Sequence, residues 1–446
     1  MKYLFPKGLY TDIRIEHVYA ANISYLMRDL EACTEQKYSA AFIRVYDGKM
    51  WYYASTSDLD GIQAEIDALA AIADRNPDIA KTAVYQNLNG HQDTVMAFVG
   101  REVSMVPLDD KVNLLHQVMP FVEKNEYIKL WGIAYQDTYT VKEFYNSKGA
   151  NLKFDYQQTG FMAFYTMMDG ERKMESQFSK AGITFADLDA FAADLEAELA
   201  ECESFMLHSE PVVPGKYSVI FAPKVTGIFA HECFGHKSES DFIIGDETAR
   251  QEWQLGKRVG SDELSIIESG NIIGGGYTPY DDEGNKATMT YLVKNGILTG
   301  RLHNADSSAD LAEPVTGNGR AMSFEYEPIV RMTTTYIDKG SKTFEELIAE
   351  TEDGILIKDM AHGMGMSTFT IAPTYAYTIK NGKIDQPVRV SVVSGNVFEA
   401  LADIDGITDK VEMFSFVIGG CGKMEQFPLP VGDGGPYIRV KNMQVQ

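Results

Sequence analysis

Residues 229–236 read Phe-Ala-His-Glu-Cys-Phe-Gly-His, so that two imidazoles stand on either side of one carboxylate. In the familiar zinc-protease helix the two histidines are spaced i and i+4, which puts both on one side, and the Glu between them serves as general base. Here His231 and His236 are spaced i and i+5. The segment therefore predicts a zinc hydrolase, provided that the helix departs from regular α geometry.

A regular α-helix would keep the two imidazoles apart, because at roughly 100° per residue it sets positions i and i+5 about 140° from each other. A single π-type turn closes an i→i+5 ring, tends to occur at functional sites, and would bring the second imidazole round to the first. We expect this distortion at Gly235. Pro223 suits a first helical turn, and the apolar spacing that starts at Val225 turns Glu232 towards the buried side. The alternative is an ordinary, partly buried helix with two satisfied histidines.

A catalytic zinc site takes three protein ligands and a water, whereas four protein ligands make a closed structural site. The possible third ligands are Cys421, His208, His303, His362, Glu239 and Asp241. Cys421 is the strongest of them, because it follows the apolar run 413–418, an expected buried strand, and lies among glycines that could aim the sulfur outward. The alternative role of Cys421 is that of a small buried hydrophobe. Cys233 is expected to pack in the core.

Four segments together resemble the TldD/PmbA family, and they occur in the family's order. They are the motif His-Glu-Cys-Phe-Gly-His-Lys-Ser-Glu-Ser-Asp at 231–241, the hairpin Tyr-Leu-Val-Lys-Asn-Gly at 291–296, the run Pro-Val-Thr-Gly-Asn-Gly-Arg at 314–320, and Gly-Cys-Gly-Lys at 420–423 with Leu-Pro-Val-Gly at 429–432. The resemblance is detailed from about residue 211 to the C-terminus. Before that point only the overall layout is similar.

The resemblance implies a zinc metalloprotease that acts on unfolded or extended peptides, with His231, His236 and Cys421 as zinc ligands and Glu232 as general base. Partner subunits in the family lack the zinc motif, so the intact motif places this chain on the catalytic, TldD-like side. The family also implies a dimer that encloses the active site, either a homodimer or a heterodimer with a related PmbA/TldE-like subunit.

Glycine-rich segments at 274–276 and 316–320 lack both the Walker pattern and the strand-to-helix context of a nucleotide loop, which favours turns. In the family setting, glycine-rich edges beside zinc would let a peptide backbone approach and pair as an added strand. We expect this substrate-binding role for Gly419 and Gly420, with Asn318 and Arg320 as further candidates. The acidic stretch 281–283 is expected to be an exposed turn and not a second metal site.

The charge of the chain excludes some partners. Lys and Arg number 40 and Asp and Glu 64, which gives a net charge of −24 that repels nucleic-acid phosphates and anionic lipid headgroups. The four cysteines are scattered without a paired spacing, and the sequence has neither a long apolar signal region nor about 18 uninterrupted apolar residues. We therefore expect a cytoplasmic protein that binds no nucleic acid and no membrane.

The pattern along the 446 residues predicts an α+β protein with an N-terminal mixed α/β domain at 1–210 and a β-rich C-terminal metalloprotease domain at 211–446. Asp47-Gly48 predicts a hairpin within 38–53, and Asn-Gly pairs predict type I′ hairpins near 295 and 381. Apolar periodicity predicts helices at 22–33, 59–75, 109–124 and 184–202, and strands within 127–175 and at 217–221.

Two other functions remain open on the sequence alone. One is a non-catalytic assembly or binding subunit with a structural zinc, which a fourth protein ligand would favour. The other is a zinc hydrolase of a non-peptide amide. The preferred hypothesis is a metallopeptidase in which Zn²⁺ activates a water and Glu232 takes its proton.

Overall fold

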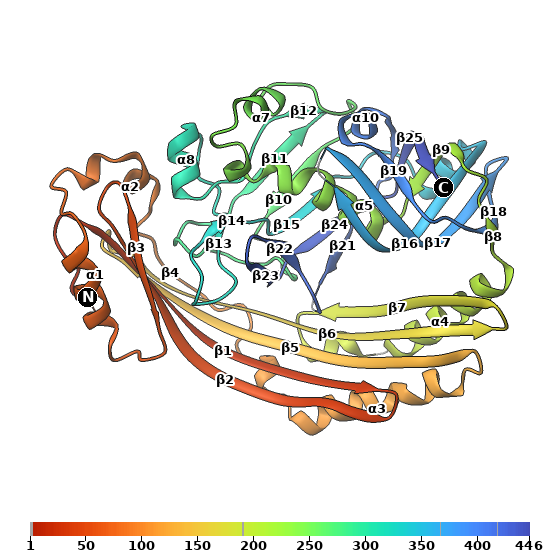
Figure 1. Ribbon diagram of the computed structural model, residues 1–446, viewed down its shortest axis with the longest axis horizontal. Helices are drawn as coiled ribbons and strands as arrows, with labels where there is room; N and C mark the ends of the chain where they lie inside the picture. Colours follow the sequence, from red (N-terminus) through yellow and green to blue (C-terminus); the bar gives the residue numbers. More distant parts are fainter. Residues whose placement is uncertain (1–2, 190, 366, 417) are drawn as a thin grey trace.

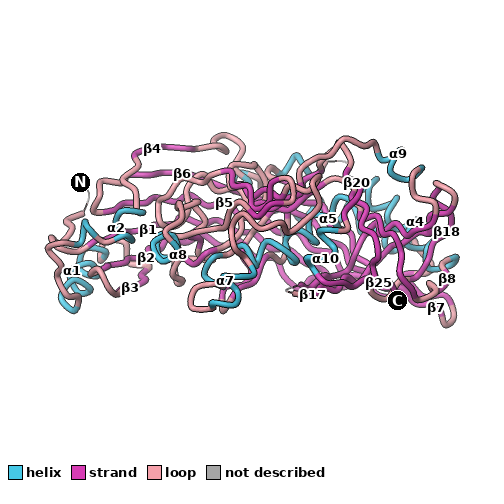
Figure 2. The backbone as a smooth tube through the Cα atoms, turned by 90° about the horizontal axis from the view of Figure 1, so that it is seen from above, coloured by secondary structure: helices cyan, strands magenta, loops and turns pink. Residues whose placement is uncertain are grey.

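The computed structural model describes residues 3–189, 191–365, 367–416 and 418–446. It confirms the α+β class, with one long seven-stranded sheet built from the N-terminal half of the chain, and an eight-stranded and a six-stranded sheet built from the C-terminal half. Figure 1 shows the long sheet curving beneath the C-terminal sheets, and Figure 2 shows from above that the helices of the C-terminal half are short.

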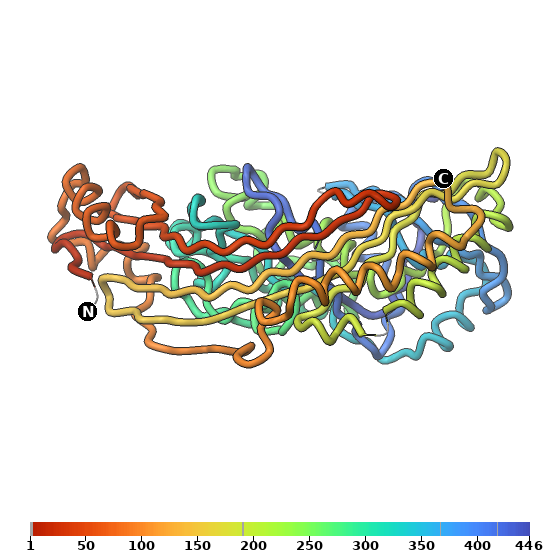
Figure 3. The backbone as a smooth tube through the Cα atoms, turned by 90° about the horizontal axis from the view of Figure 1, so that it is seen from below, coloured from red at the N-terminus to blue at the C-terminus, as the bar shows by residue number. Residues whose placement is uncertain are grey.

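The N-terminal sheet has seven strands in the order β3-β2-β1-β5-β6-β4, with β7 also paired to β6. Its strands are β1 Tyr10–Leu26, β2 Asp29–Tyr46, β3 Trp51–Thr56, β4 Gln92–Val95, β5 Ile128–Asn146, β6 Asn151–Asp169 and β7 Arg172–Gly182. All its strand pairs are antiparallel except β4 with β6. Figure 3 shows its long strands, coloured red to yellow, running along the length of the molecule.

Four helices accompany this sheet, namely α1 Ile62–Ile72, α2 Ala83–Asn87, α3 Leu108–Lys124 and α4 Phe191–His208, with short 3₁₀ turns at Ile79–Lys81, Val103–Met105 and Phe185–Leu188. The apolar faces of α3 and α4 pack on sheet residues such as Trp131, Tyr135 and Phe161 in one core. The predicted helices at 59–75 and 109–124 are therefore confirmed as α1 and α3.

The C-terminal half holds an eight-stranded and a six-stranded sheet. The first has the order β16-β9-β25-β19-β17-β18-β8, with β20 on β25, and the second the order β12-β11-β10-β15-β24-β21. Two-stranded pairs β13–β14 and β22–β23 lie beside them. The bounds are β8 Glu210–Pro211, β9 Gly215–Phe221, β10 Ile266–Ser269, β11 Met289–Lys294, β12 Ile297–Leu298, β13 Gly319–Arg320, β14 Ile329–Val330, β15 Thr334–Ile337, β16 Asp353–Gly365, β17 Thr368–Lys380, β18 Lys383–Arg389, β19 Val393–Asn396, β20 Ile404–Ile407, β21 Glu412–Ser415, β22 Cys421–Lys423, β23 Gln426–Leu429, β24 Gly432–Gly435 and β25 Ile438–Val445.

Helix α5 (Pro223–Ala230) lies in the core between these two sheets. Its buried Val225 and Phe229 pack with Phe221 and Ile357 of one sheet and with Ile337 of the other. The remaining helices are α6 His236–Ser238, α7 Glu247–Glu252, α8 Ala305–Leu311, α9 Phe344–Ala349 and α10 Val397–Ala402, with a 3₁₀ turn at Ser240–Phe242. No helix in the part of the chain that the structure describes is long and apolar enough to cross a membrane.

The turn predictions are confirmed. Asp47 and Gly48 join β2 to β3, and the backbone N–H of Asp47 donates to the carbonyl of Met50 at 3.2 Å. Both Asn-Gly pairs have the two positive φ angles that a type I′ turn requires, 49° and 77° at 295–296 and 52° and 70° at 381–382.

Three predicted elements are wrong in kind or extent. Residues 22–33 are not a helix but the end of β1 and the start of β2, because β1 pairs along its length with both β2 and β5. The helix expected from Thr184 starts later, because Thr184 caps a 3₁₀ turn and α4 begins at Phe191. The expected buried strand at 413–418 is the half-exposed edge strand β21, and residue 417 lies outside the described residues.

The acidic stretch 281–283 is buried and not an exposed turn, since its three side chains are at most 6% exposed. It faces cations of the N-terminal sheet. Arg44 Nη1 donates to Glu283 Oε1 at 3.1 Å, and Lys142 Nζ donates to Asp282 Oδ1. Buried charges persist when they are paired, so the N-terminal sheet supplies the partners that let this acidic loop enter the interior.

Candidate metal centre

The helix that carries the histidines changes its geometry where the sequence predicts. Regular α-helix α5 ends at Ala230, a π-helical turn spans His231–Gly235, and α6 resumes at His236. A π turn adds one residue to the helical repeat, which compensates for the i+5 spacing. The two imidazole ring centroids are consequently 5.1 Å apart, with an angle of 84° between the ring planes.

Cys421 joins the two histidines from a distant part of the chain. It begins β22, and its Sγ lies 3.6 Å from His236 Nε2. One ligand atom each from His231, His236 and Cys421 lie within 4.8 Å of one another. Tetrahedral zinc with bonds of about 2.0–2.3 Å places its nitrogen and sulfur ligands roughly 3–4 Å apart, so this cluster fits a zinc ion with little adjustment.

The electrostatics of the cluster favour a metal-binding thiolate. Burial opposes ionisation of the Cys421 thiol, but hydrogen bonds and charge from His231 and His236 outweigh burial and lower the Cys421 pKa to about 5. A thiolate is the form of cysteine that binds metal. Glu232 is half-buried in the π turn between the two histidines, and its charge acts on His231.

A carboxylate that the sequence analysis did not assign to this role lies at the second ring nitrogen of His236, the one that does not face Cys421. His236 Nδ1 lies 3.2 Å from Oε2 of the fully buried Glu239, which leaves Nε2 to face Cys421. Lys423 holds that carboxylate, with Nζ 3.2 Å from Glu239 Oε2, and also pairs with Asp241 at 2.6 Å. Metal-binding histidines usually pair their second nitrogen with a carboxylate in this way. The i, i+3 spacing of His236 and Glu239 could have predicted this contact, because such residues are neighbours on a helix.

The other candidate ligands are not part of this three-residue group. Glu239 and Asp241 form ion pairs with Lys423. His303 Nε2 lies 3.0 Å from Glu313 Oε2, and its Nδ1 lies 3.2 Å from the Ser307 hydroxyl. His208 is the last residue of α4, and His362 is exposed on β16. Within residues 3–189, 191–365, 367–416 and 418–446, His231, His236 and Cys421 form the one group of three or more such side chains that could hold a metal.

Two of the four candidate substrate-binding residues line a common cavity. A pocket of about 250 Å³ between the N-terminal sheet and the C-terminal half includes Gly419 and Arg320, together with Leu429 and Pro430. Arg320 Nη2 donates to the carbonyl of Pro430 at 2.9 Å. Gly420 has φ 151°, and a Cβ there would meet the Leu429 carbonyl oxygen at 2.5 Å, so this residue must be glycine.

Asn318 is held by contacts inside the protein. Its side-chain amide is buried and donates to the Arg331 carbonyl at 3.0 Å and to Glu268 Oε1 at 3.4 Å. Asn318 is not among the residues that line the pocket beside Gly419. In this structure its side chain therefore holds neighbouring strands and does not line that pocket.

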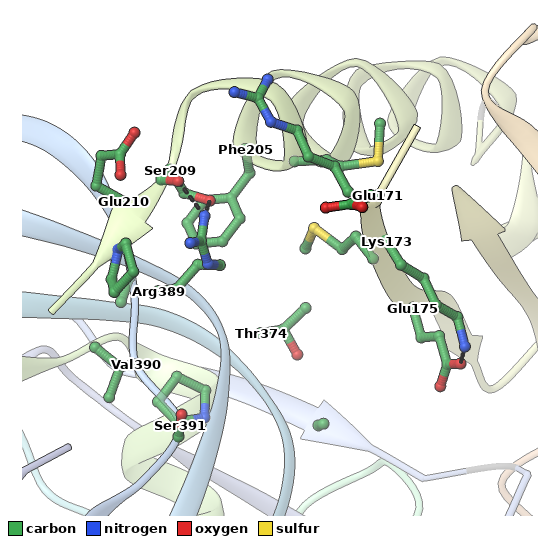
Figure 4. Close-up of a pocket in the computed structure, with 17 residues that line it drawn as sticks. Glu171, Lys173, Glu175, Phe205, Ser209, Glu210, Thr374, Arg389, Val390 and Ser391 are labelled. Carbon is green, nitrogen blue, oxygen red and sulfur yellow. Dashed lines mark hydrogen bonds and ion pairs between the residues drawn. The ribbon is translucent and has the colours of Figure 1, made fainter. Parts of the chain in front are cut away.

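A larger cavity of about 760 Å³ lies away from the three candidate ligands. Figure 4 shows it between the start of β7, the end of α4 and the strands β17 and β18. At one side of it, Arg389 at the end of β18 contacts Ser209, which precedes the paired strand β8, with 3.3 Å between Arg389 Nη1 and Ser209 Oγ. Neither this cavity nor the 250 Å³ pocket is lined by His231, His236 or Cys421, but the 250 Å³ pocket includes Gly419, two residues before Cys421.

The close packing of the π turn leads to a prediction. A Cβ at Gly235 would come within 2.1 Å of Met332 Sδ, so Gly235→Ala should force the turn or the methionine to move. We expect a loss of stability of about 1–3 kcal/mol, typical of overpacking, together with weaker zinc binding. Urea unfolding and a chelator titration would measure both effects. The double variant Gly235→Ala/Met332→Ala should bind zinc better than Gly235→Ala alone, and an unaltered Gly235→Ala protein would contradict this packing argument.

Comparisons with known proteins identify the family of this chain. Residues 214–446 match the family model of the PmbA/TldA metallopeptidase C-terminal domain, and residues 11–73 match PmbA/TldA metallopeptidase domain 1. A metalloprotease from Synechocystis sp. is 30% identical over 98% of this chain and 94% of its own length. A zinc metalloprotease TldD homolog from Saccharolobus solfataricus is 28% identical over 98% and 96%.

A solved structure shares the fold. TldE from Thermococcus kodakarensis superposes with a TM-score of 0.75 at 15% identity and covers 98% of this chain and 96% of its own. The match to the C-terminal family model spans more than half of the chain, and the Synechocystis relative covers nearly all of it. The chain therefore belongs to the TldD/PmbA family of metallopeptidases.

Proposed function

We propose that this chain is a zinc-dependent protease that cleaves unfolded or extended peptides. The observation that carries the proposal is the cluster of His231, His236 and Cys421, whose ligand atoms lie within 4.8 Å of one another around a π turn that also holds Glu232. The described part of the chain offers three protein ligands there and no fourth. Three ligands leave a position for water, which favours a catalytic over a structural zinc.

Each residue has a separate task in this proposal. Bound zinc would polarise the substrate carbonyl and lower the pKa of the attacking water. Glu232 takes the proton of that water and passes it to the leaving nitrogen, a role proposed because Glu232 directly follows His231 in the π turn and its charge acts on that imidazole. Glu239 holds the His236 ring by its Nδ1, which presents Nε2 to the metal position.

The surroundings of the cluster suit a peptide backbone. Gly419 and Gly420 precede Cys421 directly, and Gly419 lines the 250 Å³ pocket with Arg320. Glycines allow close approach of a second chain, and pairing through main-chain atoms would accept many sequences in extended form. A folded substrate could not offer a free strand, so the substrate class that follows is unfolded or extended peptide.

The partner and the compartment belong to the same proposal. Because TldE of Thermococcus kodakarensis shares the fold over nearly the whole chain, we propose a dimer, either of two copies or with a TldE-like subunit. All four cysteines are free, with one exposed, which suits a reducing cytoplasm. We also propose that residues 1–210 and 211–446 are the two domains, with the catalytic residues in the second.

A peptide panel tests this function. The purified protein, alone and with its TldE-like partner, is incubated with a reduced and alkylated protein, with the same protein folded, and with short peptides, each with and without a chelator. We expect cleavage of the unfolded substrates only, loss of cleavage with chelator, and recovery on adding zinc. Hydrolysis that survives the chelator, or a zinc-loaded protein that cleaves no peptide, would contradict the proposal.

A further inference from the structure

A row of buried polar side chains lies under the helix that carries His231. Strand β10 pairs with β15 so that Glu268 opposes Thr335, and β15 pairs with β24 so that Thr335 is level with Asp433. Cross-strand neighbours point to the same face of a sheet, so these three side chains share one face. Glu268 and Asp433 are each only 1% exposed, and burying two carboxylates this deeply calls for a functional reason.

Asp433 lies against α5 at a place that a glycine leaves open. A Cβ added to Gly227 would come within 2.8 Å of Asp433 Oδ1 and within 2.6 Å of the Gly434 backbone nitrogen. His231 follows Gly227 by four residues, and helical positions i and i+4 lie on the same face. The carboxylate of Asp433 therefore sits on the side of the helix that leads to His231. Burial raises the pKa of Asp433 to about 7, and the charge of His231 opposes that rise.

Two buried atoms here have no hydrogen-bond partner among the described residues, and they are complementary. One is Nδ1 of His231, which can donate, and the other is Oδ1 of Asp433, which accepts. Glu268, the other nearby carboxylate, already accepts from the Thr333 and Thr335 hydroxyls. Leaving a buried polar group without a hydrogen bond destabilises the folded protein, so a partner for each atom is expected.

We propose that Asp433 is the outer carboxylate that positions His231 for the metal, accepting a hydrogen bond from its Nδ1–H either directly or through one buried water. His236 has the same arrangement, with Glu239 at its Nδ1. The two zinc-binding imidazoles would then each be oriented by a buried carboxylate, one from α6's own loop and one from strand β24. Asp433 contacts no substrate and acts as a positioning residue. The inference rests on the proposed zinc site.

Zinc affinity tests the inference without relying on activity. Competition with a chromophoric chelator gives the zinc dissociation constant of the wild type, of Asp433→Asn and of the control Glu268→Gln, which alters the other carboxylate of the same row. Loss of an outer partner typically weakens zinc binding about 10–100-fold, and we expect this for Asp433→Asn. We expect Glu268→Gln to weaken zinc binding less than about 10-fold, which is below that range. Equal zinc affinity of Asp433→Asn and the wild type, or an equal loss in both variants, would overturn the inference.

A purely structural role gives a different pattern. It would lower the thermal midpoint of the zinc-free protein in Asp433→Asn while leaving the zinc affinity and the visible spectrum of the Co²⁺-substituted protein unchanged. We expect the Co²⁺ spectrum to change, because the orientation of the His231 ring alters the ligand field. If the wild type binds no zinc, the proposed function itself is wrong. If Asp433→Asn binds zinc as tightly as the wild type, only the inference that Asp433 positions His231 is wrong.

A zinc-bound crystal structure of the wild type tests the same point should Asp433→Asn not fold. We expect His231 Nδ1 within hydrogen-bond distance, about 2.7–3.2 Å, of Asp433 or of a water that also contacts Asp433. A different acceptor at His231 Nδ1, such as a backbone carbonyl or Glu268, would refute the assignment.

Discussion

Replacing Cys421 with Ser, or His236 with Ala, is expected to reduce zinc from about one ion per chain to nearly none. Each change removes one of three ligand atoms that lie within 4.8 Å of one another, and two ligands do not hold zinc against water at neutral pH. Since loss of an outer partner alone costs about 10–100-fold in affinity, loss of a ligand should cost more than about 100-fold. Elemental analysis after gel filtration would measure the zinc content directly.

Cys233→Ala is the matched control for this experiment. Cys233 lies in the π turn between His231 and His236 and is 1% exposed, but it packs in the hydrophobic core and is not one of the three candidate ligands. The Cys233→Ala protein should keep its zinc even if its stability falls. Unchanged zinc content in Cys421→Ser or His236→Ala would show that the ion binds elsewhere.

Glu232→Gln should separate chemistry from metal binding. Glutamine keeps the size and hydrogen-bonding capacity of the side chain but cannot accept a proton from water at neutral pH. General acid–base groups contribute about 10²–10⁴-fold to rate, so we expect kcat for peptide hydrolysis to fall by that factor while zinc content stays near one. Activity and elemental analysis on the same preparation would test both parts.

The control for this variant is Glu247→Gln, which makes the same chemical change at an exposed position of α7. It should leave kcat unaffected. If Glu232→Gln retained wild-type turnover, Glu232 would not be the base, and if it lost zinc as well, its role would be in building the site.

Local signals predicted much of the fold because they depend on short-range chemistry. The Asp47-Gly48 turn, the Asn-Gly turns at 295 and 381, and helices α1 and α3 all follow from residues within one or two turns of each other. The prediction of a helix at 22–33 was wrong, because the pairing of β1 with both β2 and β5 determines the conformation of that segment. Long-range pairing of this kind overrides local periodicity.

The candidate site divides in the same way. The i+5 spacing of His231 and His236 alone required a widened helix, and the π turn at His231–Gly235 supplies it, because ring directions on a helix follow from residue count. Sequence also singled out Cys421, and the structure brings its sulfur to 3.6 Å from His236 Nε2. Its role as a zinc ligand stays a prediction.

What surrounds the ligands depended on tertiary structure. The acidic stretch 281–283 looked exposed, yet it is buried against Arg44 and Lys142 from strands more than a hundred residues away. The two buried carboxylates near the histidines are also positioned by distant segments. Lys423 pairs with Glu239, and the register of β24 places Asp433 beside α5. Motif spacing is a property of one segment and can be read from it, whereas burial and charge pairing depend on which distant segments meet, and only the packed fold decides that.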